Sequence, residues 1–196
     1  MRTRKELVLV RGRIRAAAGW ALLVALLSAA GASAQYQGEF YVHTDQRFWW
    51  YQGDNRLFEL LVPSQGEQYM ERDVFGEKML EITLRGGSPI IRVASFPGGS
   101  AALDRARQAV TGRWQHVLSN AQTTENRTIT TSNGLQARFV VIQGRTPSGQ
   151  TAMMRAVFFN NGDHNVYLQW LGLTSQYGGA NQEFWLQAVN TFAWLR

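Results

Sequence analysis

The residue types that could carry out chemistry are few and scattered in this 196-residue chain. It contains no cysteine, which excludes thiol nucleophiles, thiolate metal sites and disulfide bonds. Its three histidines, His43, His116 and His164, are far apart, and none has the spacing of a zinc-binding pair on a helix. No Gly-x-Ser-x-Gly motif marks an exposed serine nucleophile. The sequence therefore predicts a protein without catalytic residues and without a cofactor.

Acidic residues gather in one segment and are the other candidates for chemistry. Glu67, Glu71 and Asp73 lie close together, and Glu77 and Glu81 follow them. Paired carboxylates can act as general acid and base, and carboxylate oxygens are ligands that calcium prefers. Because the segment lacks the alternating Asp and Asn residues of a calcium-binding loop, we expect a solvated, mobile loop. Glu67, Glu71 and Asp73 are the candidate ligands if a metal binds at all.

A run of four aromatic residues, Phe48, Trp49, Trp50 and Tyr51, is the feature most indicative of binding. Aromatic side chains with a polar edge are favoured at protein interfaces, at carbohydrate-binding faces and at membrane surfaces. The same four residues could instead close an open end of the hydrophobic core. We take as a hypothesis that they form part of the contact with a membrane-bound protein partner.

The charge of the chain is concentrated at its N-terminal end. The net charge is +6, but residues 1–34 hold six of the 20 basic side chains and one of the 14 acidic ones. Residues 35–196 are therefore close to neutral, with 14 basic side chains against 13 acidic ones. No basic stripe stands out in this part, so binding to nucleic acid is not predicted.

Residues 1–34 have the features of an export signal. A basic stretch, residues 1–15, precedes the apolar residues 16–30, and small residues then occupy the positions that a signal peptidase reads. Cleavage is predicted between Ala34 and Gln35. The alternative is an uncleaved anchor, with residues 16–34 in the membrane and the basic end in the cytoplasm. Both interpretations predict an exported protein in the periplasm or at the periplasmic face of the cytoplasmic membrane.

Alternating hydrophobic residues predict strands over 56–62, 77–84 and 90–96. A helix is expected to begin at Ser100, which can cap it. The spacing of its apolar residues gives one stripe that faces a sheet. That stripe consists of Leu103, Ala106, Val110, Trp114 and Val117.

The second half of the chain predicts an antiparallel meander followed by a helix. A short strand is expected over 128–131, then three long strands over 135–143, 151–159 and 164–171, joined by turns rich in Gly, Asn and Pro. A last helix, about 180–195, would place five apolar residues on the sheet: Phe184, Trp185, Ala188, Val189 and Phe192. The predicted fold class is α+β, an antiparallel sheet covered by two main helices.

This order of elements resembles the PsbP-like superfamily, which includes the extrinsic PsbP subunit of photosystem II, Ran-binding Mog-type proteins and DcrB-like envelope proteins. Four segments carry the resemblance: the strand ending in Pro at 57–63, the central helix at 100–118, the Asn-Gly-x-x-Ala entry to the meander at 133–137, and the closing helix at 184–195. The expected organisation is therefore a signal or anchor over 1–34, an aromatic-rich segment over 35–55, and a PsbP-like domain over 56–196.

These motifs consist of packing and turn residues, so the resemblance implies a fold without an active site. Together with the leader, it predicts a non-catalytic, exported binding or accessory protein of the cell envelope. In its sharper form this protein docks on a membrane-bound complex at its periplasmic face. Two alternatives stay open: a periplasmic ligand or glycan carrier that uses the aromatic residues, and an unrecognised envelope hydrolase.

Overall fold

The computed structural model describes residues 38–53, 56–65, 68–74, 77–84 and 88–195, with the side chains of 68–78 not described. The predicted leader and its cleavage site at Ala34 and Gln35 lie outside the described residues. Among those residues, no helix is long and apolar enough to cross a membrane.

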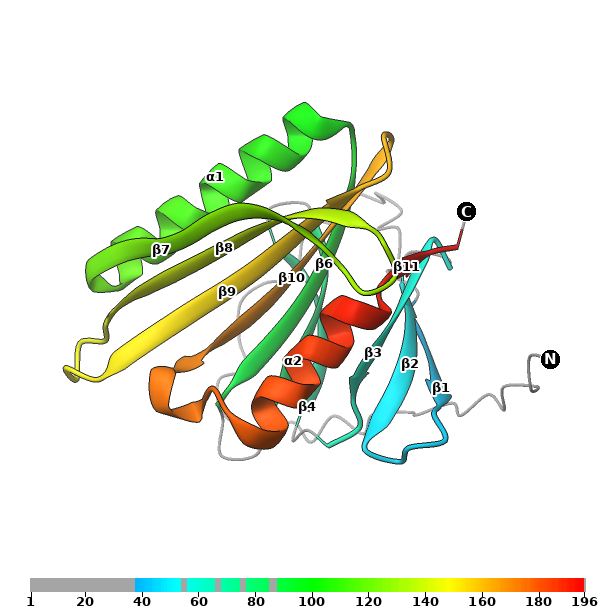
Figure 1. The fold of residues 1–196 in the computed structure, drawn as a ribbon, viewed down its shortest axis with the longest axis horizontal. Coiled ribbons are helices and arrows are strands. Elements are labelled where there is room, and N and C mark those ends of the chain that lie inside the picture. The colour runs from blue at the N-terminus through cyan, green and yellow to red at the C-terminus, as the bar shows by residue number, and fades with distance from the viewer. Residues whose placement is uncertain (1–37, 54–55, 66–67, 75–76, 85–87, 196) are drawn as a thin grey trace, which may run out of the picture.

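Two antiparallel sheets and two main helices make up the fold (Figure 1). The large sheet has the strand order β4 (Gln68–Val74), β5 (Glu77–Thr83), β6 (Ile90–Pro97), β10 (His164–Leu173), β9 (Thr151–Asn160), β8 (Gln136–Arg145) and β7 (Ser119–Thr130). The small sheet has the order β1 (Glu39–Val42), β2 (Phe48–Gly53), β3 (Phe58–Pro63) and β11 (Ala193–Trp194). The helices are α1 (Ser100–Val117) and α2 (Gly179–Thr191), and a single 3-10 turn, η2 (Thr174–Gln176), precedes α2.

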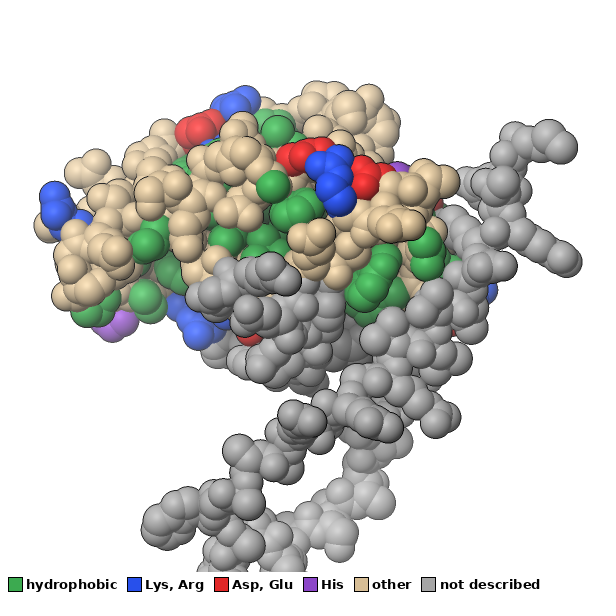
Figure 2. Space-filling view, turned by 90° about the horizontal axis from the view of Figure 1, so that it is seen from below, with side chains coloured by type: hydrophobic (Ala, Val, Ile, Leu, Met, Phe, Trp, Pro, Cys, Tyr) green, Lys and Arg blue, Asp and Glu red, His purple; other side chains and the backbone are tan. Residues whose placement is uncertain are grey.

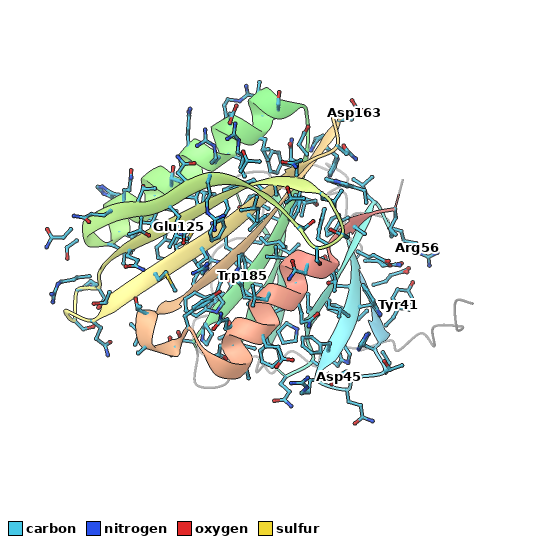
Figure 3. The ribbon with its side chains drawn as sticks, in the orientation of Figure 1. Tyr41, Asp45, Arg56, Glu125, Asp163 and Trp185 are labelled. Carbon is cyan, nitrogen blue, oxygen red and sulfur yellow. The ribbon has the colours of Figure 1, made fainter. Side chains whose placement is uncertain are left out.

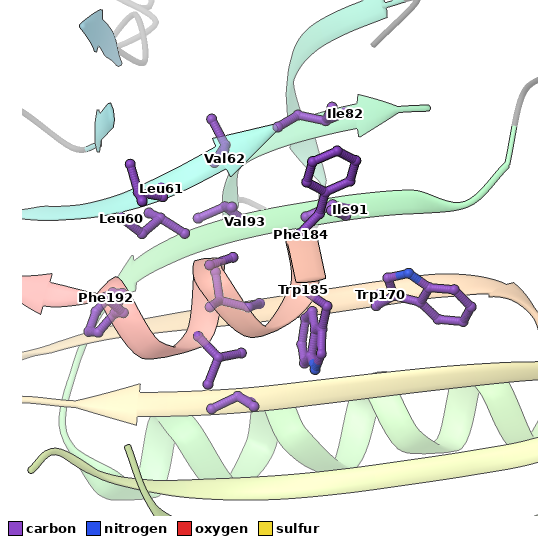
Figure 4. Close-up of a cluster of buried hydrophobic side chains, with 14 of the residues drawn as sticks. Leu60, Leu61, Val62, Ile82, Ile91, Val93, Trp170, Phe184, Trp185 and Phe192 are labelled. Carbon is purple, nitrogen blue, oxygen red and sulfur yellow. The ribbon is translucent and has the colours of Figure 1, made fainter. Parts of the chain in front are cut away.

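The two helices cover opposite faces of the large sheet. Alternate residues of each central strand point to opposite faces, so Val140 and Ile142 of β8 pack in the cluster under α1. Phe139 and Val141 of the same strand belong to the larger cluster on the other side. There, α2 and the small sheet lie next to each other and together cover the large sheet (Figures 1 and 4). The sequence pattern predicted one sheet with two helices, and the second sheet is an addition to it.

The predicted meander is confirmed, since β7, β8, β9 and β10 pair in chain order. Strand β7, however, has 12 residues, whereas the sequence predicted a strand over 128–131 alone. Most of its side chains are exposed because it is the edge of the sheet, and its first half is polar, so no hydrophobic alternation marks it. The acidic segment was also predicted wrongly as a loop, because its backbone forms β4 and pairs with β5.

Helix α1 differs from its prediction at both ends. Gly99 is the N-cap, and no side chain caps the helix, so Ser100 does not have the expected role. Leu103 and Ala106 are buried as predicted, but Val117 is 51% exposed. Leu118 packs where Val117 was expected to pack. It follows the last helical residue, has extended backbone angles and turns its buried side chain toward the sheet.

Helix α2 places the five predicted apolar residues in the core, but it ends earlier than expected. All five, Phe184, Trp185, Ala188, Val189 and Phe192, are buried. At Phe192 the backbone leaves the helix, and the following residues form β11, which pairs with β3. The Phe192 ring stacks on Phe159 with 4.0 Å between ring centres, so this break places an aromatic anchor in the core and lets the chain join the small sheet.

Candidate partner-binding surface

The four aromatic residues that the sequence singled out all lie in β2, but they divide between core and surface. Phe48 is 2% exposed and packs edge-on against Phe184, with 5.5 Å between ring centres. Tyr51 is fully buried beside Phe58. Trp49 and Trp50 are half-buried. Phe48 and Tyr51 are core residues, and Trp49 shares the face of Tyr51 and packs against Phe40, with 5.7 Å between ring centres. The partner-contact hypothesis therefore concerns chiefly Trp50, on the opposite face, and it stays a prediction.

The register of the small sheet places Trp50 in a row that crosses three strands. Tyr41 of β1 pairs with Trp50, and Trp50 pairs with Leu61 of β3. Directly opposite residues of antiparallel strands share a face, so these three side chains stand next to one another. The ring of His43, which follows β1, lies 5.8 Å from that of Trp50.

A second, polar row lies on the same face, two residues along each strand. Glu39 of β1 pairs with Gln52 of β2, which pairs with Glu59 of β3. We call the two rows, together with Arg56, the outer face of the small sheet. It comprises Glu39, Tyr41, Trp50, Gln52, Arg56, Glu59 and Leu61. Figure 3 shows Tyr41 and Arg56 on the side of the small sheet that is turned away from the large sheet and from α2.

The turn between β1 and β2 is held by local hydrogen bonds and tied to α2. The Asp45 carboxylate accepts a hydrogen bond from the backbone N–H of Arg47 at 3.0 Å, and the Arg47 guanidinium contacts both carboxylate oxygens. The same guanidinium donates to both oxygens of Glu183, at 2.9 and 3.0 Å. Seen from this lower end, the surface carries a close group of acidic and basic side chains with hydrophobic ones beside it (Figure 2).

Hydrogen bonds connect the polar groups of the outer face. The Tyr41 hydroxyl donates to the Glu39 carboxylate, which also accepts from the Arg56 guanidinium at 2.8 Å. The Gln52 amide donates to Glu59 at 2.8 Å. The hydrogen bond from Tyr41, and then those from Arg56, hold the pKa of Glu39 below its ordinary value against an opposing effect of burial. Burial, and then Glu39, raise the pKa of Tyr41. Glu39 is therefore ionised and Tyr41 protonated at neutral pH, which suits recognition better than proton transfer.

The other described carboxylates are also engaged. Each carboxylate with a described side chain accepts a hydrogen bond from a neighbouring side chain, except Asp163, which is exposed in a turn. Glu81, for example, is 5% exposed and accepts from Arg92 at 2.8 Å. These carboxylates serve as acceptors in structural contacts with neighbouring side chains.

The remaining candidates for chemistry are not brought together. His43 follows β1, His116 is exposed near the end of α1, and His164 begins β10. No group of three His, Asp or Glu residues among the described part of the chain could hold a metal ion. The backbones of Glu71 and Asp73 lie in β4, opposite Leu80 and Lys78. Glu67 lies outside the described residues, so this metal-site candidate stays a prediction.

The sequence analysis missed Glu39, Tyr41, Gln52 and Arg56 as parts of the candidate surface. A signal was present in the alternation of Glu39 with Tyr41, which predicts that both lie on one face of a strand. The pairing of this strand with Trp50 could not be foreseen, because the aromatic run 48–51 is continuous and does not set a register.

Comparisons with known proteins show which solved structures have a similar fold. No protein-family model matches the sequence, and no curated protein is close enough in sequence to count as a relative. The solution structure of cyanobacterial PsbP from Synechocystis sp. PCC 6803 is similar with a TM-score of 0.51 and 12% identity, covering 86% of this chain and 98% of that one. At this identity the likeness concerns the fold alone.

Two further solved structures have lower TM-scores, which do not by themselves indicate a shared fold. One is a protein of Bacteroides thetaiotaomicron, with a TM-score of 0.49 and 11% identity over 75% of this chain; the chain spans 48% of that protein. The other is a Pseudomonas aeruginosa protein of unknown function, with a TM-score of 0.40 and 17% identity, covering 68% of this chain and 88% of that one. The likeness to cyanobacterial PsbP matches the order of strands and helices expected from the sequence, and the chain has a PsbP-like fold.

Proposed function

We propose that this protein is an exported, non-catalytic accessory protein of the cell envelope. In this proposal it binds a membrane-bound protein complex at its periplasmic face through the outer face of the small sheet. The leader-like residues 1–34 support export, and the PsbP-like fold is compatible with an accessory role, although a fold alone does not determine function.

The observation that carries the proposal is the arrangement of the two rows on the outer face. Trp50 stands half-buried between Tyr41 and Leu61, which are 8% and 5% exposed, and the ionised groups Glu39 and Arg56 lie at the edge of this row. Protein interfaces commonly combine an aromatic centre with a polar rim, and tryptophan, tyrosine and arginine contribute most of the binding energy there. Tyr41 and Glu39 satisfy each other's hydrogen-bonding groups, so the face is preorganised for contact.

The alternative of an envelope hydrolase receives less support. Acid–base hydrolysis needs a carboxyl or imidazole group that can exchange a proton near neutral pH. The pKa of Glu39 is lowered and that of Tyr41 is raised, so both move away from neutrality. Glu59 accepts a hydrogen bond from the Gln52 amide, and Glu81 accepts one from the Arg92 guanidinium. These groups suit binding surfaces and structural ion pairs.

The proposal predicts that Trp50→Ala removes the partner without unfolding the protein. The full chain, carrying Trp50→Ala, would be purified from native membranes after mild cross-linking, and recovered proteins quantified by mass spectrometry. We expect the recovery of a stoichiometric membrane partner to fall at least about 10-fold, which corresponds to roughly 1.4 kcal/mol, a typical effect of one interface tryptophan. Trp114→Ala is the matched control, because Trp114 is also half-buried but belongs to α1 and packs against the cluster on the other side of the large sheet.

A photo-reactive amino acid at Gln52 gives a second measurement that does not depend on weakening the fold. It should cross-link to the partner, whereas the same group at Gln108, an exposed position of α1, should not. Retention of the partner by Trp50→Ala, together with equal cross-linking from both positions, would show that the outer face is not the docking surface.

A further inference from the structure

A second group of side chains, separate from the small sheet, lies on the large sheet around Arg155. Arg155 belongs to β9, and its guanidinium carbon lies 5.0 Å from the centre of the Phe139 ring in β8. It also lies 4.4 Å from the centre of the Tyr177 ring, which follows η2. Two aromatic rings from different elements therefore hold one cation, an arrangement that stabilises a positive charge where water is scarce. We call this group, with Glu125 and Trp170, the Arg155 cluster.

Its place in the fold follows from the strand register. Arg155 pairs with Val141 of β8 on one side and with Trp170 of β10 on the other, and Val141 in turn pairs with Glu125 of β7. These positions share the face of the large sheet that α2 partly covers. In Figure 3 the labels of Glu125 on β7 and Trp185 on α2 mark the two sides of this region, in which β8 and β9 form the floor.

Arg155 differs from the other half-buried arginines among the described residues. Arg92 donates to the Glu81 carboxylate at 2.8 Å, and Arg107 donates to the Asp104 carboxylate at 3.2 Å. Arg155 has no carboxylate partner in the described part of the chain, and its buried Nε atom, like that of Arg107, has no hydrogen-bond partner. The Nε–H of Arg155 is a buried donor, and leaving such a donor unsatisfied away from water is costly. The Arg155 cluster thus has donors in excess of acceptors.

The neighbouring groups add to this excess. Trp170 is fully buried, lies edge-on to Tyr177 with 5.1 Å between ring centres, and its indole N–H has no hydrogen-bond partner. Glu125 could in principle neutralise Arg155, but it accepts a hydrogen bond from Arg127 at 3.0 Å. The pKa of Tyr177 is raised mainly by burial, while Arg155 lowers it and Glu125 raises it, which is consistent with all three lying within electrostatic reach. The missing component is an anionic acceptor.

We propose that the Arg155 cluster binds the oxyanion of a small organic acid, a carboxylate or a phosphate group, with Arg155 as its cationic partner. The planar guanidinium matches the spacing of two oxygens on either group, and its hydrogen bonds to an anion are short and strong. The Tyr177 and Phe139 rings fix the orientation of the guanidinium. Arg155 is half-buried, so part of its side chain remains within reach of a small ligand from solvent.

Nuclear magnetic resonance on the full chain tests the proposal. The ¹⁵N-labelled protein would be titrated separately with sodium phosphate and with sodium benzoate at constant ionic strength, with sodium chloride as the reference for screening. We expect saturable shifts of the Arg155 Nε–H and Trp170 indole resonances with at least one of the two anions, and shifts with one alone assign the ligand class to phosphate or to carboxylate. Shifts no larger than those with chloride would overturn the proposal.

Variants distinguish the site from general attraction of anions. Arg155→Gln should raise the dissociation constant at least about 10-fold, because it removes a charge-assisted hydrogen bond. Arg138→Gln should leave it unchanged, since Arg138 is exposed and donates to Thr128 on β7. Equal weakening by both variants would mean that only net charge matters and would overturn the proposal.

Two further variants keep the test open if Arg155→Gln does not fold. Arg155→Lys keeps the charge but loses the planar fork, so we expect weaker binding by several-fold. Glu125→Gln removes a negative charge near the proposed anion and should tighten binding about 2-fold to 5-fold, as expected for a partly screened charge. If Arg155→Lys binds as tightly as the unchanged protein and Glu125→Gln has no effect, the anion does not bind at this cluster.

Discussion

Adjacent residues of β2 have different roles because a strand turns successive side chains to opposite faces. Tyr51 is fully buried and lies 5.0 Å, centre to centre, from the ring of Phe40, whereas Trp50 lies on the outer face beside Tyr41. A hydrophobic run in the sequence does not reveal this difference, since all four aromatic residues have similar hydrophobicity. Residue-level statements about the candidate surface therefore rest on the pairing of β1, β2 and β3.

The hydrogen bond from Tyr41 to Glu39 makes a prediction about a single pKa. In Tyr41→Phe we expect the pKa of Glu39 to rise toward its ordinary value, because the Tyr41 hydroxyl is the largest influence that lowers it. Arg56 remains and should keep part of the effect. The measurement is a ¹³C titration of the Glu39 side-chain carbonyl by nuclear magnetic resonance, with Tyr177→Phe as a distant control that should leave this pKa unchanged.

The sign of the pH dependence follows from the same shift. A carboxyl group whose pKa is lower in the folded than in the unfolded state stabilises the fold above its unfolded pKa, and this contribution is lost as the pH falls through the folded value. Tyr41→Phe should therefore reduce the part of the acid sensitivity that comes from Glu39. An unchanged Glu39 pKa in Tyr41→Phe would mean that the hydrogen bond is not formed in solution.

At the scale of elements, the corner between α1 and β7 depends on close packing against β8. A Cβ atom at Gly144 in β8 would lie 2.7 Å from the Cβ of Leu118 and 3.0 Å from the carbonyl oxygen of Ser119. The pairing of β7 with β8 also shifts register between Ser119 and Gln122. Glycine at 144 thus lets the chain leave α1, bury Leu118 and begin the edge strand in a short space.

This corner predicts opposite effects for two Gly→Ala substitutions. Gly144→Ala should lower the free energy of unfolding by about 1–3 kcal/mol, as expected when an extra carbon meets backbone atoms in a packed region. Gly112 lies in the exposed part of α1, where an added Cβ atom would meet no atom outside the backbone of its own helix within 4 Å. Gly112→Ala should therefore raise the free energy of unfolding by about 0.5–1 kcal/mol, because alanine has the higher helix propensity. Urea unfolding of both variants provides the comparison, and a neutral Gly144→Ala would contradict the close approach at this corner.

At the scale of the whole molecule, the fold has two hydrophobic clusters separated by the large sheet. One lies under α1, and the larger one lies under α2 and the small sheet (Figure 4). The outer face of the small sheet and the Arg155 cluster belong to different parts of this architecture. A protein partner on the first and a small anion on the second would therefore not compete for the same residues.

The whole chain also carries a prediction about its maturation. We expect the protein isolated from its native envelope to begin at Gln35, because Ala32 and Ala34 place small residues where a signal peptidase reads them. Intact-mass spectrometry measures this directly. Ala34→Trp should block cleavage and retain residues 1–34. A full-length mass for the unchanged protein would instead favour the anchored alternative, with residues 16–34 in the membrane.

Much of the large sheet could be predicted from the sequence because local periodicity encodes it. The strands β8, β9 and β10 are largely apolar segments that the sheet buries on both faces, and they are joined by turns such as Asn161-Gly162, where Gly162 has a positive φ of 105°. The inward face of α2 was predicted residue by residue, because the burial of a helix stripe depends on spacing alone. Strand β7 could not be predicted in full, since an edge strand with polar side chains has no such pattern.

The sequence by itself determined the fold class, the meander, the apolar stripe of α2 and the absence of cysteine chemistry. Only the tertiary structure decided which of the aromatic residues in β2 are core, that β11 joins β3, and that Arg155 meets Phe139 and Tyr177. The physical reason is the range of the interactions. Periodicity and turn chemistry act over a few residues, whereas strand register and ring–cation contacts join residues that are far apart in the chain and depend on the whole packed molecule.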